Sequence, residues 1–311
     1  MLEIVHLILP VFITIFIGYL IAHFKVLEKE HFKVMGLFAI KVAIPCLLLV
    51  SISSHDFHSL IQVPYLIAYS LASFIVFLSA FGIYRYVIKT PITESSVMAM
   101  GSSMSNTGFI GSGLLYMFLG ERAAIYFGMT FLVENFVIFL MFLICLELGK
   151  SQQSLKDILK TGLSNIIKNP IIIALIIGSA LSFFSLQLPE QLIKVLQPIG
   201  QTTMPVGLLV IGGSLYGITL ASQKKLGRDL SITVSLKLVT LPLLVFGIFQ
   251  CLPNTNAEMI FAGTLLSSVS MVGLFAIFGQ QYDMKKVPTI LLFSTLLSIF
   301  SISTVIHFLH L

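Results

Sequence analysis

The sequence is short of charged residues. Only 10% of its 311 residues are Asp, Glu, Lys or Arg, whereas 57% are hydrophobic. A soluble domain carries roughly 25% charged residues, so this chain cannot cover a water-facing surface of ordinary size, and its mean hydropathy of +1.03 agrees. The composition predicts an all-α protein that crosses a lipid bilayer several times. The net charge of +5 does not indicate a nucleic-acid partner, because membrane proteins gather Lys and Arg in loops on one side.

Cysteines are few, and catalytic motifs are absent. Cys46, Cys145 and Cys251 lie in apolar stretches without the spacing of a metal or redox site, so we expect them to pack as small apolar side chains. The sequence has no HExxH, GxSxG or Walker pattern. These absences argue against an enzyme, a metal site and a bound cofactor. Coupling of the protein's activity to H⁺ or Na⁺ stays open.

Long apolar runs predict ten membrane spans, because each span needs roughly 20 apolar residues. The spans cover residues 3–24, 33–53, 63–86, 95–119, 123–147, 168–186, 191–221, 230–251, 257–280 and 287–309. Fourteen of the eighteen lysines and arginines lie in loops after odd-numbered spans, and only Arg122 and Lys194 lie in the other loops. The positive-inside rule places the first set in the cytoplasm and both termini outside. We therefore expect a multi-pass protein of the plasma or inner membrane.

Two pairs of segments indicate an internal repeat. Pro45 in span 2 lies 160 residues before Pro205 in span 7, and Gly101 in span 4 lies 162 residues before Gly263 in span 9. Five spans in each half force the second half to enter the membrane in the opposite sense. The sequence thus predicts two inverted five-helix repeats, a design of secondary transporters. Their expected boundaries are residues 1–149 and 168–311, with a cytoplasmic linker at 150–167.

The stretch MGSSMSNTGFIGSGLL, residues 100–115, is polar and rich in glycine inside an apolar span. Irregular backbone at membrane depth survives only beside protein or a water-filled cavity. We expect interruptions of spans 4 and 9 at Ser105, Asn106, Thr107 and Gly108, and at Ser267, Ser268 and Ser270. Half-helix N-termini that meet there would suit a small anion such as a carboxylate. Tight helix packing through glycine and serine at four-residue spacing is the competing interpretation.

Three ionisable residues fall inside the expected spans, where charge is costly and usually functional. Glu134, next to Asn135, is a candidate coupling or gating carboxylate, because burial favours the protonated form. A neutral, hydrogen-bonded structural carboxyl group is the alternative. Lys41 can attract an anionic substrate, pair with a carboxylate or extend to the cytoplasmic surface. For Lys237 we expect that its side chain reaches this surface.

Two further features have simple structural explanations. Pro45 and Pro205 can kink their helices, which would also support a neighbouring site. His55, Asp56 and His58 are spaced like a partial metal cluster, but they fall in an expected external loop without a complete ligand set. A solvated turn is the expected structure there.

The segments NTGFIGSGLLYMFLGE, IPCLLL and MPVGLLVIGGSL resemble the auxin efflux carrier family. The resemblance covers essentially the whole chain, and that family includes bacterial permeases for small dicarboxylates and plant auxin exporters. It implies ten helices, with spans 4 and 9 crossing as broken helices and the prolines of spans 2 and 7 shaping the pocket. It also implies a scaffold and a moving bundle, a role for Asn106 in facing the substrate carboxylate, and the option of a homodimer. Span 9 departs from the family pattern at Ser267, Ser268 and Ser270, which leaves the substrate open.

These features predict a secondary active transporter of small organic anions, such as mono- or dicarboxylates. Substrate would bind where the broken helices meet, and transport would proceed by alternating access. A channel is usually built by symmetric subunits around a pore, which the inverted repeat does not favour. A ligand-binding membrane sensor on the same fold is the second alternative, and a measurement of flux separates it from a transporter.

Overall fold

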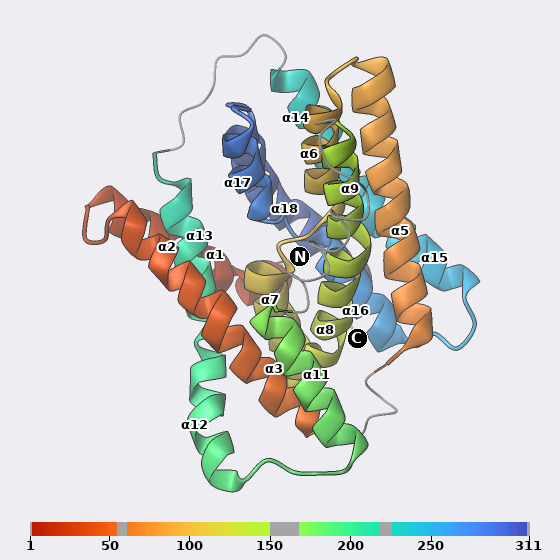
Figure 1. Ribbon diagram of the computed structural model, residues 1–311. Helices are drawn as coiled ribbons and strands as arrows, with labels where there is room; N and C mark the ends of the chain where they lie inside the picture. The colour runs from red at the N-terminus through yellow and green to blue at the C-terminus, as the bar shows by residue number, and fades with distance from the viewer. Residues whose placement is uncertain (1, 55–60, 150–167, 218–225, 310–311) are drawn as a thin grey trace. The chain divides into compact units, whose positions relative to one another are not determined.

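The computed structural model describes residues 2–54, 61–149, 168–217 and 226–309, and all regular elements in these ranges are helices (Figure 1). The chain divides into two compact units. Unit 1 comprises Met1–Gln62, Thr107–Met129 and Ile167–Gly217, and unit 2 comprises the remainder. Each unit draws on both halves of the chain. The repeat boundaries at 149 and 168 stay predictions, and the predicted linker at 150–167 lies outside the described residues.

Unit 1 is built from three stretches of the chain, one at its start and two nearer its middle. Its elements are α1 (Leu2–His23), α2 (Lys29–Phe38), η1 (Ala39–Ala43), α3 (Ile44–Ser53), η3 (Thr107–Gly111), α7 (Ser112–Leu119), η4 (Gly120–Arg122), α11 (Pro170–Phe183), α12 (Glu190–Gln201) and α13 (Thr203–Leu215). Helix α8 (Ala123–Val133) begins in unit 1 and ends in unit 2.

Unit 2 holds the rest of the chain. Its elements are α5 (Val63–Gly82), η2 (Ile83–Val87), α6 (Ile92–Ser103), η5 (Glu134–Phe139), α9 (Leu140–Leu148), α14 (Leu226–Ser235), η6 (Leu236–Thr240), α15 (Leu241–Cys251), α16 (Ala257–Ser268), α17 (Leu274–Gln281) and α18 (Val287–Leu309). Helix α6 packs against α5, α9 and α14, and α16 packs against α15 and α18.

Six helical stretches in the described ranges are long and apolar enough to cross a membrane, and all but the last join consecutive elements: Glu30–Ser53, Val63–Val87, Thr107–Leu146, Glu190–Gly213, Leu226–Cys251 and Val287–Leu309. The prediction of an all-helical membrane protein is confirmed. The ten-span count and the inverted repeat stay predictions. Helix α11, at 14 residues, is shorter than a full span, and the expected ninth span is divided between α16 and α17.

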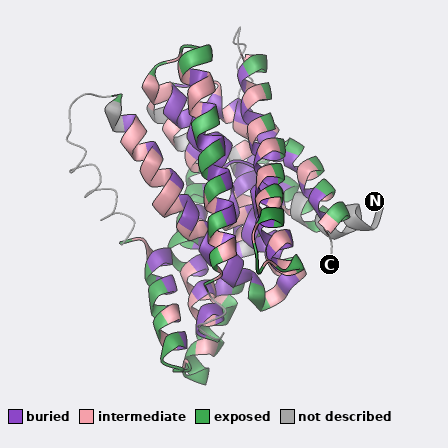
Figure 2. Ribbon diagram, turned by 90° about the vertical axis from the view of Figure 1, so that its right-hand side faces the viewer, coloured by how far each residue is buried: buried purple, intermediate pink, exposed green. Residues whose placement is uncertain are grey.

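Helix α5 shows how the surface suits a bilayer. It exposes large apolar side chains at Ile67, Leu71 and Leu78 and buries the small residues Ala72 and Ser73 on another face. Exposed positions recur along single faces of the other long helices as well (Figure 2). Because lipid tails are as apolar as these side chains, helices in a membrane associate through close packing and polar contacts rather than through the hydrophobic effect.

Glycines allow two helices of unit 1 to touch through their backbones. A Cβ at Gly212 of α13 would collide with the carbonyl of Ile15 in α1, and one at Gly18 of α1 would collide with the carbonyl of Leu209 in α13. Such small residues are typical of tight interfaces between membrane helices. The absence of a side chain at these two positions therefore sets the spacing of α1 and α13.

The expected seventh span, residues 191–221, is not one continuous helix. Helix α12 ends at Gln201, and α13 begins at Thr203, with Thr202 between them. The predicted end of the span at residues 218–221 lies outside the described residues. Pro205 is the third residue of α13, a position where the missing amide proton costs little because the first turn of a helix has no internal partner for it.

Candidate functional site

Two helices of unit 2 end in the middle of apolar segments. Helix α6 ends at Ser103, and the next helical turn along the chain begins at Thr107. Helix α16 ends at Ser268, and α17 begins at Leu274. We call residues 104–106 the first break and residues 269–273 the second break. The breaks include Ser105, Asn106 and Ser270, as the sequence predicts. The expected interruption at the other four positions is wrong, because Thr107 and Gly108 begin η3 and Ser267 and Ser268 end α16.

The two breaks lie against each other in unit 2. Ser105 and Met271 form an isolated antiparallel bridge. The amide of Asn106 donates to the carbonyl of Ser270 over 2.8 Å, and the amide of Val272 donates to the carbonyl of Met104 over 3.3 Å. A backbone group without a partner costs several kcal/mol in a bilayer. Backbone groups of one break therefore pair with backbone groups of the other where both helices are interrupted.

Lys237 lies at the breaks and not at a membrane surface, so the expectation for this side chain is wrong. It is fully buried, and its Nζ donates to Ser105 Oγ over 2.6 Å and to the carbonyl of Ser267 over 2.7 Å. Ser267 belongs to the last turn of α16, where the helix dipole attracts a cation. The break supplies acceptors that a continuous helix would not offer, and these hold the ammonium group inside.

Glu134 reaches the same serine from another helix. Its side chain is 3% exposed, and Oε1 accepts hydrogen bonds from the Ser105 amide at 2.8 Å and from the Tyr69 hydroxyl at 3.2 Å. Tyr69 OH and Ser105 Oγ are 3.1 Å apart. Since an ammonium group only donates and a carboxylate only accepts, the donors run from Lys237 through Ser105 and Tyr69 to Glu134. Opposite charges thus meet through one serine and one tyrosine, which reduces the cost of burying them.

Three serines lie in or just before the second break, and they differ in their hydrogen bonds. Ser267 Oγ and Ser268 Oγ donate back to carbonyls of their own helix, at 2.8 Å each. The Ser270 hydroxyl is fully buried and has no hydrogen-bond partner among the described residues. Asn106 is 7% exposed. A buried hydroxyl without a partner is costly, so Ser270 is the position in the breaks that most clearly calls for a bound polar group.

Other predicted site residues fall elsewhere. The Asn135 amide donates to the Phe131 carbonyl of its own helix at 2.8 Å. Lys41 is exposed and belongs to unit 1, as do Pro45, in the first turn of α3, and Pro205. Thr107 and Gly108 begin η3, also in unit 1. The hydrogen bonds of the network described above join residues of unit 2 to one another.

A π-helical turn surrounds each ionisable residue that the sequence places inside a span. Lys41 lies in η1, Glu134 in η5 and Lys237 in η6. A π turn widens the helix by one residue and is frequent at functional sites. In unit 2, η5 and η6 carry the two charged ends of the network.

Sequence reasoning missed Tyr69 and misplaced Lys237. Nothing in the α5 sequence distinguishes Tyr69 from a tyrosine that packs as an apolar residue. A signal did exist for Lys237, because the side chain of a lysine inside a span can point toward a polar interruption in a neighbouring span as easily as toward the membrane surface. The carboxylate at Glu134, which needs a cation when buried, was the missing reason to choose the inward direction.

A cavity of about 710 Å³ also lies in unit 2, lined by α14, α15 and α18 and by Thr264 of α16. Its lining carries no charged side chain, so it does not suit an anion. Among the described residues, no group of three or more His, Cys, Asp or Glu side chains could hold a metal ion. His55, Asp56 and His58 lie outside the described residues.

Comparison with known proteins decides the family. A family model described as membrane transport protein matches residues 3–306. The chain belongs to this family, which is that of the auxin efflux carriers. The chain is 24% identical over 310 residues to a protein of Rhizobium meliloti (strain 1021) named "Putative malonate transporter", an alignment that covers 99% of this chain and 96% of that protein. It is 26% identical over 223 residues to an uncharacterized transporter of Methanocaldococcus jannaschii, covering 67% of this chain and 68% of the relative.

The family confirms the resemblance seen in the sequence. The chain is a membrane transporter, so a small-molecule substrate and a lipid bilayer are its partners. The family and the names of both relatives indicate transport rather than catalysis.

Proposed function

We propose that this transporter carries small organic anions, in particular mono- and dicarboxylates, by alternating access powered by an ion or substrate gradient. The observation that carries the proposal is the pair of hydrogen-bonded breaks, with Asn106 and the unpartnered Ser270 hydroxyl at their centre. Interrupted helices that meet inside a transporter are a usual place for substrate. The name of the Rhizobium meliloti relative gives malonate as the first acid to test.

The breaks would offer an anionic substrate hydrogen-bond donors rather than an unbalanced cation. Lys237 is balanced by Glu134 through Ser105 and Tyr69, so a carboxylate that enters meets a pair of charges that is already neutral. Donors from Asn106 and Ser270 would then bind the carboxylate without a second buried lysine. If transport is coupled to protons, Glu134 is the group that would accept one during the cycle. Coupling to Na⁺ would instead require a cage of oxygen ligands.

We also propose ten spans in two inverted repeats in the cytoplasmic membrane, with both termini outside. One contact supports the alternation of the spans: Lys286, before the last span, lies within 2.5 Å of Glu94, at the start of the fourth. The loops after spans 3 and 9 are both odd-numbered, and the alternation requires them on the same side. A homodimer is a further expectation from the family.

The experiment is a thermal-shift titration of the purified protein with malonate, acetate and malonamide, the neutral diamide of malonate. A ligand that binds only the folded state stabilises it by about 2.7 kcal/mol at 100 times Kd. We expect malonate to raise the Tm of the wild type and malonamide to leave it unchanged. Ser270→Ala and Asn106→Ala should lose most of the shift, whereas the matched Ser268→Ala should keep it, because Ser268 bonds to its own helix.

Uptake into proteoliposomes completes the test. Saturable malonate uptake that Asn106→Ala abolishes supports a transporter with its site at the breaks. Binding without flux would instead identify a sensor, and flux that does not saturate would identify a channel. An acid that stabilises wild type, Asn106→Ala and Ser270→Ala equally would place its site elsewhere and overturn the proposal for the breaks.

A further inference from the structure

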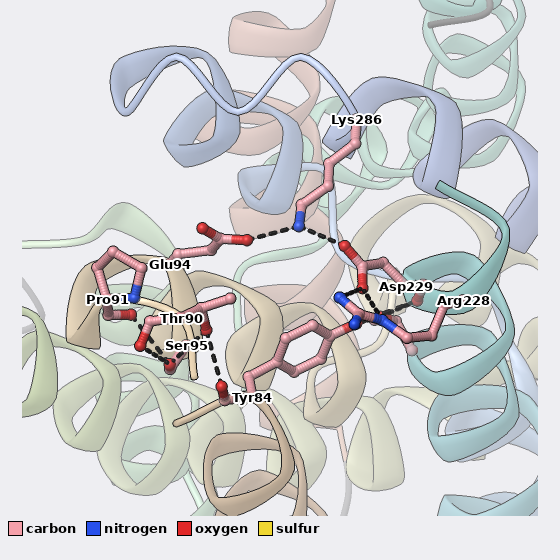
Figure 3. A network of polar contacts seen from close by, with 9 residues as sticks. Tyr84, Thr90, Pro91, Glu94, Ser95, Arg228, Asp229 and Lys286 are labelled. Atoms are coloured by element: carbon pink, nitrogen blue, oxygen red, sulfur yellow. Dashed lines mark hydrogen bonds and ion pairs between the residues drawn. The ribbon is translucent and has the colours of Figure 1, made fainter. Parts of the chain in front are cut away.

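A second polar network in unit 2 lies where four elements begin or end (Figure 3). Lys286, just before α18, contacts Glu94 in the first turn of α6 and Asp229 in the first turn of α14, at 2.5 Å each. Arg228 pairs with the other oxygen of Asp229 at 3.0 Å. Tyr84 donates its hydroxyl to the Asp229 carbonyl at 3.1 Å. The two acids and two bases balance, and the Asp229 and Lys286 side chains are only 2% and 12% exposed.

This network and the one at the breaks join the same two helices at opposite ends. Helix α6 runs from Glu94 toward Ser105, and α14 with η6 runs from Asp229 to Lys237, with α6 packed against both α14 and η6. Lys286 bridges their starts, and Lys237 reaches from η6 to Ser105. At 1.5 Å per residue, the eight residues from Asp229 to Lys237 span roughly 12 Å.

Between the two networks, α6 meets α14 and η6 through apolar side chains, while Thr233 of α14 hydrogen-bonds to Tyr84 of η2 over 2.7 Å. Val97 and Met98 of α6 belong to one buried cluster with Val234 and Leu238 of the opposing helix. Apolar contact is not directional, so it does not fix how far one helix is shifted along the other. Ion pairs with defined partners do fix that shift.

We infer that Lys286 is a positioning residue for the substrate site: it fixes α6 along α14 so that Ser105 meets Lys237. Without the lysine, Glu94 and Asp229 would retain one cation between them and repel each other across the two helices. The starts of α6 and α14 would separate, and the distance from Lys237 Nζ to Ser105 Oγ would no longer be held. The inference rests on the proposed function only for its effect on transport.

The test is a double-mutant cycle on Tm with Lys286→Gln and Ser105→Ala, read without any substrate. Sites this far apart normally act additively. We expect the Tm loss from Ser105→Ala to fall below about half its wild-type size in the Lys286→Gln background, because the contact it removes is already loosened. Additive losses would overturn the inference. If Lys286→Gln does not yield folded protein, Glu94→Gln takes its place in the cycle with the same expectation.

Transport provides the second measurement. Lys286→Gln should lower malonate uptake roughly 5- to 10-fold at equal protein amount, which is an ordinary size of coupling for residues in one network. Lys286→Arg, which keeps the positive charge, should retain most of the wild-type uptake. The matched control is Lys285→Gln, the exposed neighbouring lysine, which should transport like the wild type. Equal uptake by Lys286→Gln and Lys285→Gln would overturn the role in transport. If the wild type moves no carboxylate, the proposed function fails, while the Tm cycle still decides the positioning role.

Discussion

Units 1 and 2 face the same problem, the absence of a hydrophobic driving force between helices in lipid, and they solve it with different chemistry. In unit 1, glycines bring backbones together, as at Gly212 against Ile15 and Gly18 against Leu209. Glycines face aromatic side chains in both units, as Gly213 does in unit 1 and Gly101 and Gly263 do in unit 2, so the close backbone contacts are what distinguishes unit 1.

Buried charge follows the same division. The buried acidic and basic side chains of the described residues, Glu134, Asp229 and Lys237, all belong to unit 2. Backbone contact between helices leaves no room for adjustment, whereas a hydrogen-bonded charge network can exchange one partner for another. The unit that carries the breaks is thus the one whose contacts can rearrange when a polar ligand arrives.

The largest effect should come from the centre of the unit 2 network. Lys237→Met removes two hydrogen bonds and the cation that balances Glu134. Breaking a buried pair from one side costs about 3–5 kcal/mol, so we expect a large fall in Tm and loss of malonate uptake. A variant that keeps the Tm and uptake of the wild type would show that the ammonium group does not hold the breaks together.

Unit 1 should respond to volume and not to charge. Gly212→Ala places a Cβ against the Ile15 carbonyl, and we expect a loss of about 2–3 kcal/mol in stability, read as a lower Tm. Gly247→Ala, in α15 of unit 2, has open space around the added atom. Since alanine favours a helix over glycine by about 1 kcal/mol, this control should be neutral or stabilising. Two equal losses would contradict the role of close backbone packing.

The smallest change in stability should follow Glu134→Gln. Glu134→Gln also breaks the buried pair, but glutamine keeps an oxygen for the Ser105 amide and the Tyr69 hydroxyl. Lys237 keeps both of its own acceptors, Ser105 Oγ and the Ser267 carbonyl. Because no hydrogen bond is lost, unlike in Lys237→Met, we expect a smaller loss of about 1–2 kcal/mol, read as a lower Tm. The informative measurement is malonate uptake from pH 5 to pH 8. If Glu134 binds the coupling proton, the variant loses the pH dependence of the wild type. An unchanged rate and pH profile would end the coupling hypothesis.

The sequence predicted the helical membrane fold and the approximate positions of the breaks, to within a few residues, because both depend on local composition. Serine and glycine in an apolar span disfavour a helix wherever they occur, and α6 ends two residues before Ser105. The division of the seventh span at Thr202 was missed, although Gly200, Gln201 and Thr203 surround it with a polar run of the same kind.

Partners far apart in the chain could not be predicted in the same way. In the sequence analysis, Lys286 was only one of the loop lysines used to orient the protein in the membrane. Its partner Glu94 lies 192 residues away in the chain, so no local pattern predicts the ion pair. Lys237 has a side chain long enough for either direction, and the acceptors that decide between them come from Ser105 and Ser267. Such contacts follow from tertiary packing, which the order of residues along one helix does not contain.

The π turns described above have a consequence for comparing this chain with its relatives. Each successive residue of an α-helix is rotated by about 100°, and a π turn accommodates one extra residue. The apolar stripe before residues 236–240 and the stripe after them therefore do not follow a single period. A relative that lacks one residue in this turn would keep both stripes in place and lose only the bulge. One-residue gaps at η1, η5 or η6 in an alignment would thus mark relatives that arrange Lys41, Glu134 or Lys237 differently.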